Sequence, residues 1–322
     1  MATAKDAELY IELSQKAFAK QNAISTDNKT FRIPNIELFS SFAGKNLQVW
    51  VNGIKNGGEA RTKSTADTVS ITETTAVLNG ENVVIESSDV TIVRASTDTH
   101  IVNSIVIDST KSLVAVQGLE GTSFTTIRGE AGGAPLIPTG AIEVCQVMTS
   151  TQASAILAVS EIEQLDGLSK ETADDIYSTN ALTGEIEFND ELQPIHVDNE
   201  TKTVMAQGFE PSYVKLSEVK DFTIPEETVS NTTEEYYGLV KNNTSFGLGT
   251  GSFKTVLENG IDDPIMKITG ENVHIKWKPS RYVEKYLIGQ SIIGVTRNYP
   301  VSGDITGDIS LNSQFKFIPY IP

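Results

Sequence analysis

Two long alternating segments near the C-terminus constrain the fold of this chain most. Leu287–Tyr299 and Asp304–Phe317 alternate apolar and polar residues, and Pro300-Val301-Ser302-Gly303 separates them. A period of two is typical of half-buried β-strands, and Pro and Gly between two such runs indicate a turn. The sequence therefore predicts a long terminal hairpin, and we expect the chain to build sheets.

The first half has the same β character in shorter pieces. Segments rich in Val, Ile and Thr recur between Phe31 and Val147, and turn signals such as Asn52-Gly53 and Asn79-Gly80 separate them. This pattern predicts an antiparallel sandwich or barrel. The expected strands are Leu47–Val51, Thr68–Ile71, Glu81–Ile85, Val90–Val93, Ile101–Ile107, Leu113–Val116, Ser123–Ile127 and Ile142–Val147.

The N-terminal segment Lys5–Gln21 predicts a different element. Its apolar residues lie roughly along one helical face, its acids cluster in the first turns, and Lys16 and Lys20 stand near its end. We therefore expect a short amphipathic helix at the start of the chain.

A polar stretch at Asp166–Asn180 suggests a domain boundary. The fold prediction is mainly β, with two sandwich-like or barrel-like domains. Residues 1–160 would form an N-terminal β domain that includes the short helix, and residues 161–322 would form a second β domain.

Residues 221–260 are polar and rich in Gly and Asn, which predicts a long loop with little regular structure. Disordered segments are poor in aromatic residues, but this one contains several. Aromatic side chains often anchor interfaces, so we expect the loop to order against another subunit. The candidate inter-subunit contact residues are Phe222, Tyr236, Tyr237, Phe246 and Phe253.

The charge is distributed unevenly along the chain. The net charge is −17; residues 1–160 carry 16 acids and 12 bases, whereas residues 161–322 carry 26 acids and 13 bases. A protein that grips nucleic acid derives its affinity from cationic side chains, so this balance argues against that class. It permits DNA to slide past an acidic wall. A charge that serves solubility alone is an equally open interpretation.

No motif indicates catalysis, and we expect neither an enzyme nor a cofactor. His100, His196 and His274 are scattered without metal-ligand spacing, and no nucleophile elbow is present. Cys145 stands in an apolar strand-like segment and is expected to be a small buried residue. Adjacent acids such as Asp174-Asp175 lack the pattern of a calcium loop, which favours solvated faces. No metal site is predicted.

The N-terminus lacks the features of a secretory signal, and no apolar run is long enough to span a membrane. The expectation is synthesis in the cytosol without a membrane anchor.

The second half of the chain resembles the major tail tube proteins of long-tailed bacteriophages. A strand and turn open it at Thr183–Phe188, the aromatic loop follows at Phe222–Phe253, and two long polar-alternating segments, Gly289–Thr296 and Gly307–Phe315, end it. The last segment is similar to the strand with which such proteins close their sheet. Many tube subunits are single domains of about half this length, so residues 1–160 need a further role.

The resemblance implies a virion protein that assembles in the host cytoplasm into stacked rings of a hollow tail tube. The rings would be hexameric, or trimeric with pseudo-hexameric symmetry if residues 1–160 form a second tube-like domain. Those residues would otherwise be an outward decoration. The implied partners are sister subunits and other tail proteins, with genomic DNA passing through an acidic lumen without specific binding.

Two other functions remain open at this point. The Thr, Ser and Asn content of residues 31–147 also fits a surface or fibre-type adhesive module that binds a host receptor or glycan. An acid-dependent hydrolase on a β scaffold is the weakest of the three.

Overall fold

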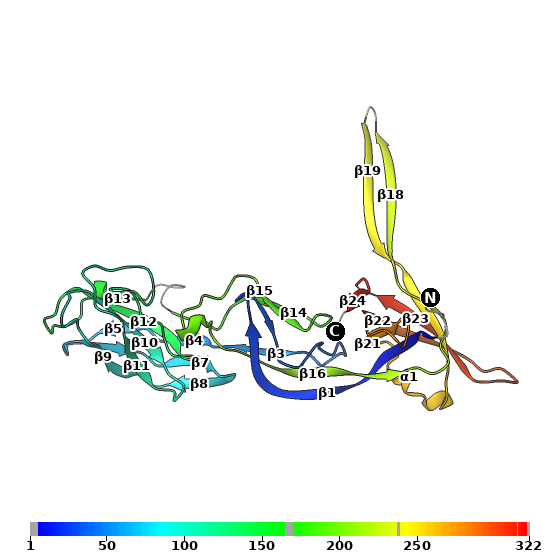
Figure 1. Ribbon diagram of the computed structural model, residues 1–322, viewed down its shortest axis with the longest axis horizontal. Helices are drawn as coiled ribbons and strands as arrows, with labels where there is room; N and C mark the ends of the chain where they lie inside the picture. Colours follow the sequence, from blue (N-terminus) through cyan, green and yellow to red (C-terminus); the bar gives the residue numbers. More distant parts are fainter. Residues whose placement is uncertain (1–5, 165–169, 237–238, 314, 321–322) are drawn as a thin grey trace.

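The chain is a mainly β protein of elongated shape. The computed structural model describes residues 6–164, 170–236, 239–313 and 315–320 (Figure 1). Strands account for 51% of the structure and helices for 4%, and among the described residues no sheet closes into a barrel. The predicted β class is therefore confirmed, and the barrel alternative is wrong for this part of the chain.

Twelve of the described strands form one large sheet along the middle and right of Figure 1. Its main path joins strands that are far apart in sequence, and β16 and β24 lie off that path, with β3 beside β16. In path order the strands are β14 (Tyr177–Asn180), β15 (Glu185–Phe188), β2 (Thr30–Arg32), β1 (Glu8–Ser25), β21 (Asn272–Lys278), β22 (Tyr286–Asn298), β23 (Thr306–Ser313), β20 (Thr250–Val256) and β17 (Lys220–Thr223), with β16 (Val204–Lys215), β3 (Gln48–Val51) and β24 (Ile318–Tyr320) beside them.

Strand β1 is the element that joins this sheet together. It pairs antiparallel with β16 from Tyr10 to Ala23, with register shifts after Glu12 and after Phe18. On its other edge, residues 8–11 pair with β21 and residues 24–25 pair with β2. One strand thus hydrogen-bonds to both the C-terminal strands and the strands in the middle of the molecule.

The helix predicted for Lys5–Gln21 is wrong, because this segment is most of β1. Leu9 and Ile11 are buried two residues apart, which is the period of a strand and not of a helix. Tertiary pairing on both edges overrides a local pattern that fits a helix. The acidic start and the lysines near the end of the segment lie on this strand instead.

The segment between β3 and β14 folds into three small sheets at the left of Figure 1, which we call the insert module (residues 53–163). Several predicted strands are confirmed there, including Thr68–Ile71, Glu81–Ile85 and Ile101–Ile107. The strands are β4 (Gly53–Gly57), β7 (Thr74–Leu78) and β8 (Glu81–Ile85); β5 (Ala60–Thr62), β6 (Thr68–Ile71) and β9 (Ser88–Thr91); and β11 (Leu113–Gln117), β10 (Ile101–Ile107), β12 (Ile142–Thr149) and β13 (Ile162–Glu163).

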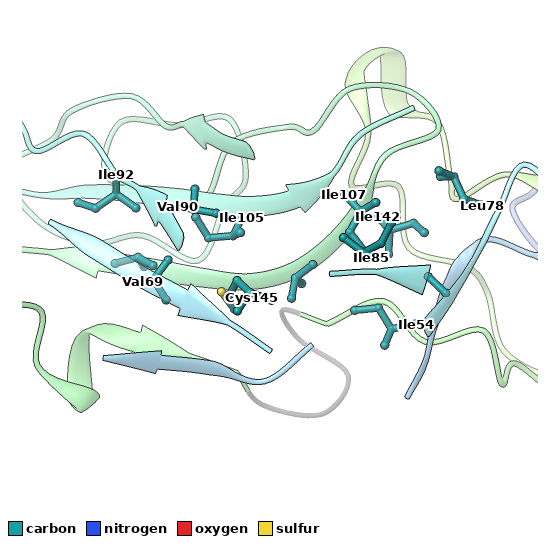
Figure 2. Close-up of a cluster of buried hydrophobic side chains, with 14 of the residues drawn as sticks. Ile54, Val69, Leu78, Ile85, Val90, Ile92, Ile105, Ile107, Ile142 and Cys145 are labelled. Atoms are coloured by element: carbon teal, nitrogen blue, oxygen red, sulfur yellow. The ribbon is translucent and has the colours of Figure 1, made fainter. Parts of the chain in front are cut away.

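The three sheets of the insert module share one hydrophobic core. Side chains from β6, β10 and β12 meet in it, as Figure 2 shows for Val69, Ile105 and Cys145. Cys145 is fully buried, which confirms its prediction as a small core residue. Burial raises the pKa of its thiol to about 12, so the thiol stays protonated and unreactive.

The C-terminal strands form a second core together with β1. Leu9 and Ile11 of β1 pack with Phe253 of β20, Ile275 of β21 and Leu311 of β23. The predicted terminal hairpin is confirmed as β22 and β23, although β23 ends at Ser313 and is shorter than expected. Because β1 contributes to this core, the start and the end of the chain are packed together.

The segment predicted as an irregular loop, 221–260, is largely strand. β18 (Glu227–Tyr236) and β19 (Leu239–Leu248) form a ten-pair antiparallel ladder, and β17 and β20 lie on either side of it in sequence. We call β18 and β19 the projecting hairpin, since Figure 1 shows it standing away from the large sheet. The Thr and Asn residues that favoured a loop prediction therefore form part of a regular antiparallel ladder.

Other predicted strands differ in detail. Ser123–Ile127 is not a strand; it lies in the loop between β11 and β12. Between β15 and β16 lies a short 3-10 turn, η3 (Val197–Asn199). The other short helices are η2 (Val159–Glu161), η4 (Gly260–Asp262) and α1 (Pro264–Lys267).

The predicted division into residues 1–160 and 161–322 stays a prediction. The hydrogen bonding does not follow it, because β1, β2 and β3 belong to the large sheet with strands of the second half. In the strand pairing, residues 53–163 are an insertion between two parts of that sheet.

Replacing Phe253 with Ala should destabilise the protein by about 3–5 kcal/mol, since a large fully buried side chain is lost and a cavity remains. Phe253 is 1% exposed, whereas Phe315 is 59% exposed and serves as the matched control. Denaturant unfolding of the two variants measures the difference. Equal, small effects from Phe253→Ala and Phe315→Ala would contradict the assignment of Phe253 to the core.

Candidate functional site

The five predicted contact residues lie in different surroundings. Tyr236 and Phe246 are residues of the projecting hairpin, where the backbone of Tyr236 pairs with Leu239 and that of Phe246 pairs with Val229. Tyr237 lies outside the described residues. Phe222 and Phe253 are not on the hairpin. The structure therefore brings Phe222 and Phe253 together, whereas Tyr236 and Phe246 lie seven residue pairs apart along the hairpin.

Phe222 and Phe253 pack against each other inside the protomer. Their ring centroids are 6.3 Å apart, and Phe222 also lies 5.9 Å from the ring of Trp277. Phe253 belongs to the C-terminal core, and the half-buried Phe222 packs against that core. Their role in this structure is to fill the core, and Phe253 is not exposed as a contact residue would have to be.

The projecting hairpin is anchored at its base and extends away from the body. Its ten residues per strand correspond to a length of about 33 Å. At the base, the Gly249 N–H donates to the Glu226 carbonyl at 2.8 Å, and Lys316 pairs with Glu227 at 3.3 Å. Among the described strands, β18 and β19 pair with each other and with no third strand.

Gly251 of β20 lies where the backbone of β20 passes close to residues 223–225. A Cβ at this position would lie 2.6 Å from the Thr223 carbonyl oxygen and 2.5 Å from the Pro225 ring, so a larger residue does not fit. The absence of a side chain at Gly251 thus permits a close approach of the backbone.

The large sheet also presents open edges. β14 and β17 stand at the two ends of its path, and all four residues of β14 are exposed. An unpaired strand edge offers a row of N–H and C=O groups to another chain. The exposed Ile176 and Tyr177 add apolar surface at the β14 edge.

The histidines have structural partners. His274 is fully buried, and its Nδ1 lies 2.9 Å from the buried Glu12 carboxylate, which also accepts the Ser40 hydroxyl proton at 2.6 Å. His196 is also buried, with Nε2 2.9 Å from the Ala141 carbonyl. His100 packs edge-on against Phe124. Sequence reasoning missed Glu12, because no local pattern marks a carboxylate whose partner is far along the chain.

A second polar cluster lies where the insert module meets the large sheet. Glu143 of β12 is 1% exposed, accepts the Ser104 hydroxyl proton at 2.6 Å and pairs with Arg128. The Glu143 N–H donates to the Glu171 carboxyl at 2.7 Å, and the Glu171 N–H donates to the Glu143 carbonyl at 3.0 Å. These bonds fix the segment that leaves the insert module, which we call the junction strap (residues 170–175).

Glu171 is the most perturbed acid of this cluster. Burial of its carboxyl raises the pKa from the ordinary value of 4.5 to about 8, and the nearby Glu143 adds to the increase. The Glu143 N–H and the cations Lys202 and Arg128 oppose the shift without cancelling it. At neutral pH, Glu171 is therefore mainly protonated. Perturbed acids cluster at functional sites as well as in structural networks.

In the described part of the chain, no group of three or more His, Cys, Asp or Glu residues is arranged to hold a metal ion. Across the same ranges, no helix has both the length and the hydropathy needed to cross a membrane.

Comparison with known proteins identified no relative of this chain. No protein-family model matches the sequence, and no curated protein matches it. The tail tube resemblance therefore rests on the order of the sequence features.

Glu171→Gln should remove a pH dependence of stability. A folded-state pKa of about 8 against an ordinary 4.5 means that the native state holds the proton more tightly, so its contribution to stability is complete below pH 4.5 and is lost as pH rises toward 8. The variant keeps an oxygen that accepts the Glu143 N–H. Denaturant unfolding at a series of pH values should show that the wild type loses stability relative to the variant over this range.

Glu120→Gln is the matched control. Three backbone N–H groups at Thr97, Ser96 and Asp98 lower the pKa of Glu120 to about 2. The difference in unfolding free energy between Glu120→Gln and the wild type should therefore stay constant between pH 5 and pH 9. If wild type and Glu171→Gln had the same pH profile of stability, the pKa of Glu171 would not be raised in the folded protein.

Proposed function

We propose that this chain is a structural subunit of a bacteriophage tail tube, which assembles with copies of itself into stacked rings. The observation that carries the proposal is the projecting hairpin, Glu227–Leu248, whose two strands have no third strand beside them among the described residues. The large mainly antiparallel sheet, with open edges at β14 and β17, is consistent with lateral pairing between subunits.

The hairpin supports assembly for a physical reason. A two-stranded hairpin is marginally stable in water by itself, and three strands or packing against another element give independent stability. An exposed ladder edge also attracts another chain. A second copy is the partner that suits a long regular arm, because identical arms can repeat one contact around a ring and between rings.

The charge distribution supports the proposed lumen. Residues 161–322 carry 26 acids against 13 bases, and these residues supply most strands of the large sheet. An acidic wall repels phosphate and lets DNA pass without adhering. In this proposal the rings are hexameric, or trimeric with pseudo-hexameric symmetry, other tail proteins close the tube, and the protein carries out no catalysis.

The insert module would then be a decoration on the outside of the tube, part of a second tube-like domain in the trimeric rings, or an adhesive module. The adhesive alternative has one specific observation in its favour. The loop between β11 and β12 exposes Leu119, Phe124 and Ile127, with exposed fractions of 60%, 37% and 56%. Such side chains are suited to a contact with a host receptor or glycan.

Shortening the projecting hairpin should abolish assembly and leave the subunit folded. We would replace residues 228–247 with Asn-Gly, which joins Glu227 to its pairing partner Leu248 through a tight turn. Electron microscopy of the wild type should show rings or hollow tubes, and the variant should stay as single subunits with a melting temperature within a few degrees of the wild type.

Phe124→Ser combined with Ile127→Ser is the control, because it alters the insert module and leaves the hairpin intact. This variant should still assemble. Tubes formed by the shortened chain would contradict the role of the hairpin in assembly. A wild type that stays monomeric while it binds glycans through Phe124 would contradict the tail tube proposal.

A further inference from the structure

The junction strap contributes to a small cavity that holds an unusual set of groups. The cavity has a volume of about 160 Å³ and is lined by side chains from the strap, from β12 and from the segments before β16. Its chemically active lining residues are Glu143, Lys170, Glu171, Asp175, Glu191 and Lys202. Leu192 and Ile195 supply an apolar wall.

Lys202 and Asp175 are in direct contact inside this cavity. The Lys202 amine nitrogen pairs with Asp175 Oδ2, and the Lys202 side chain is 11% exposed. Asp175 Oδ2 is buried from solvent and makes no hydrogen bond of ordinary geometry. The amine also donates to the Thr172 carbonyl at 2.8 Å, which holds it over the strap. The amine and the carboxyl carbon are therefore held together with little water between them.

Glu171 supplies a proton in the same cavity. It is protonated at neutral pH, as derived above, and its interaction with Lys202 is one of the influences on its pKa. Its carboxyl is held by the Glu143 N–H at 2.7 Å. An amine, a carboxyl and a neutral acid in one site are the groups that a condensation between two side chains requires.

We propose that Lys202 and Asp175 condense into an isopeptide bond, with Glu171 transferring the proton. Transfer of a proton from the Lys202 ammonium to the Asp175 carboxylate, with which it is in contact, gives a neutral amine and a neutral acid. The amine nitrogen attacks Cγ of Asp175, Glu171 gives its proton to the departing hydroxyl, and the nitrogen returns a proton to Glu171. One C–N bond forms, one C–O bond breaks, one water leaves, and no redox partner is needed.

Exposed ion pairs of the chain lack these conditions. Lys16 pairs with Glu210 at 2.9 Å, but the Lys16 side chain is 76% exposed. The Glu210 side chain is 28% exposed and that of Asp175 is 31% exposed, so the difference between the two pairs lies in the lysines. The low exposure of Lys202 and the neighbouring neutral acid distinguish the Lys202–Asp175 pair.

The bond would close a covalent loop from residue 175 to residue 202, which contains β14 and β15. It would tie the exit of the insert module to the start of β16. A cross-link of this kind restricts the unfolded chain and raises the unfolding temperature. It would also keep the insert module attached when the large sheet is under mechanical load.

The intact mass of the purified full-length protein tests the proposal directly. We expect the mass to be lower than the sequence mass by one water. Trypsin should fail to cut after Lys202 and leave residues 171–215 as one peptide that lacks one water. A glutamate-specific protease should leave residues 172–185 joined to residues 201–218, although it cuts between them; the Glu210–Pro211 bond resists cleavage. A succinimide elsewhere would lower the mass without joining these two pieces.

Four variants complete the test. Asp175→Asn should give a product of the same mass as the cross-linked wild type, because ammonia leaves in place of water. Lys202→Arg should show its full sequence mass, and Glu171→Gln should show its full mass or cross-link much more slowly while remaining folded. Lys16→Arg is the matched control and should lose one water like the wild type. A wild type of full mass with separate 172–185 and 201–218 peptides would overturn the proposal.

Discussion

The structure depends on the hydrogen bonds that β1 makes along both of its edges. On one edge it follows β16 over most of its length, and on the other it meets β21 and then β2. A buried contact strengthens this position, because Glu12 of β1 accepts both the backbone N–H and the side chain of His274 on β21. A buried polar group needs such partners, and removing one of them is costly.

This arrangement decides what each part of the chain can do. With β1 in place, the N-terminal residues Leu9 and Ile11 complete the core beneath the C-terminal strands. The large sheet is then a fixed platform from which the insert module and the projecting hairpin extend in different directions (Figure 1). Assembly through the hairpin and the open edges would add intermolecular strands to a framework that is already rigid.

Sequence patterns predicted the strands whose own residues carry a clear signal. In β23 every second side chain is buried, and in Ile101–Ile107 all seven residues are buried, as a short run of mostly apolar residues predicts. The helix prediction failed at β1, since its partners in β16 are more than 180 residues away in the sequence and decide its conformation. The loop prediction for residues 221–260 failed because the Thr-rich and Asn-rich sequences of β18 and β19 have no apolar alternation that would reveal strands.

The candidate sites were predictable only in part, for the same reason. The sequence indicated that residues 221–260 are important, but it could not separate the hairpin residue Tyr236 from the core residue Phe253. The junction cluster left no sequence signal. Glu143 and Glu171 stand 28 residues apart without a motif, and their contact arises only when the strap crosses β12.

Amide hydrogen exchange on the free and the assembled protein tests the central claim most directly. Residues 8–25 should be protected to the same degree as residues 272–278 in the free subunit, because both belong to one sheet. Residues 227–236 should exchange quickly in the free subunit and slowly after assembly. Rapid exchange along β1 in the free subunit, or a hairpin equally protected in both states, would contradict this account.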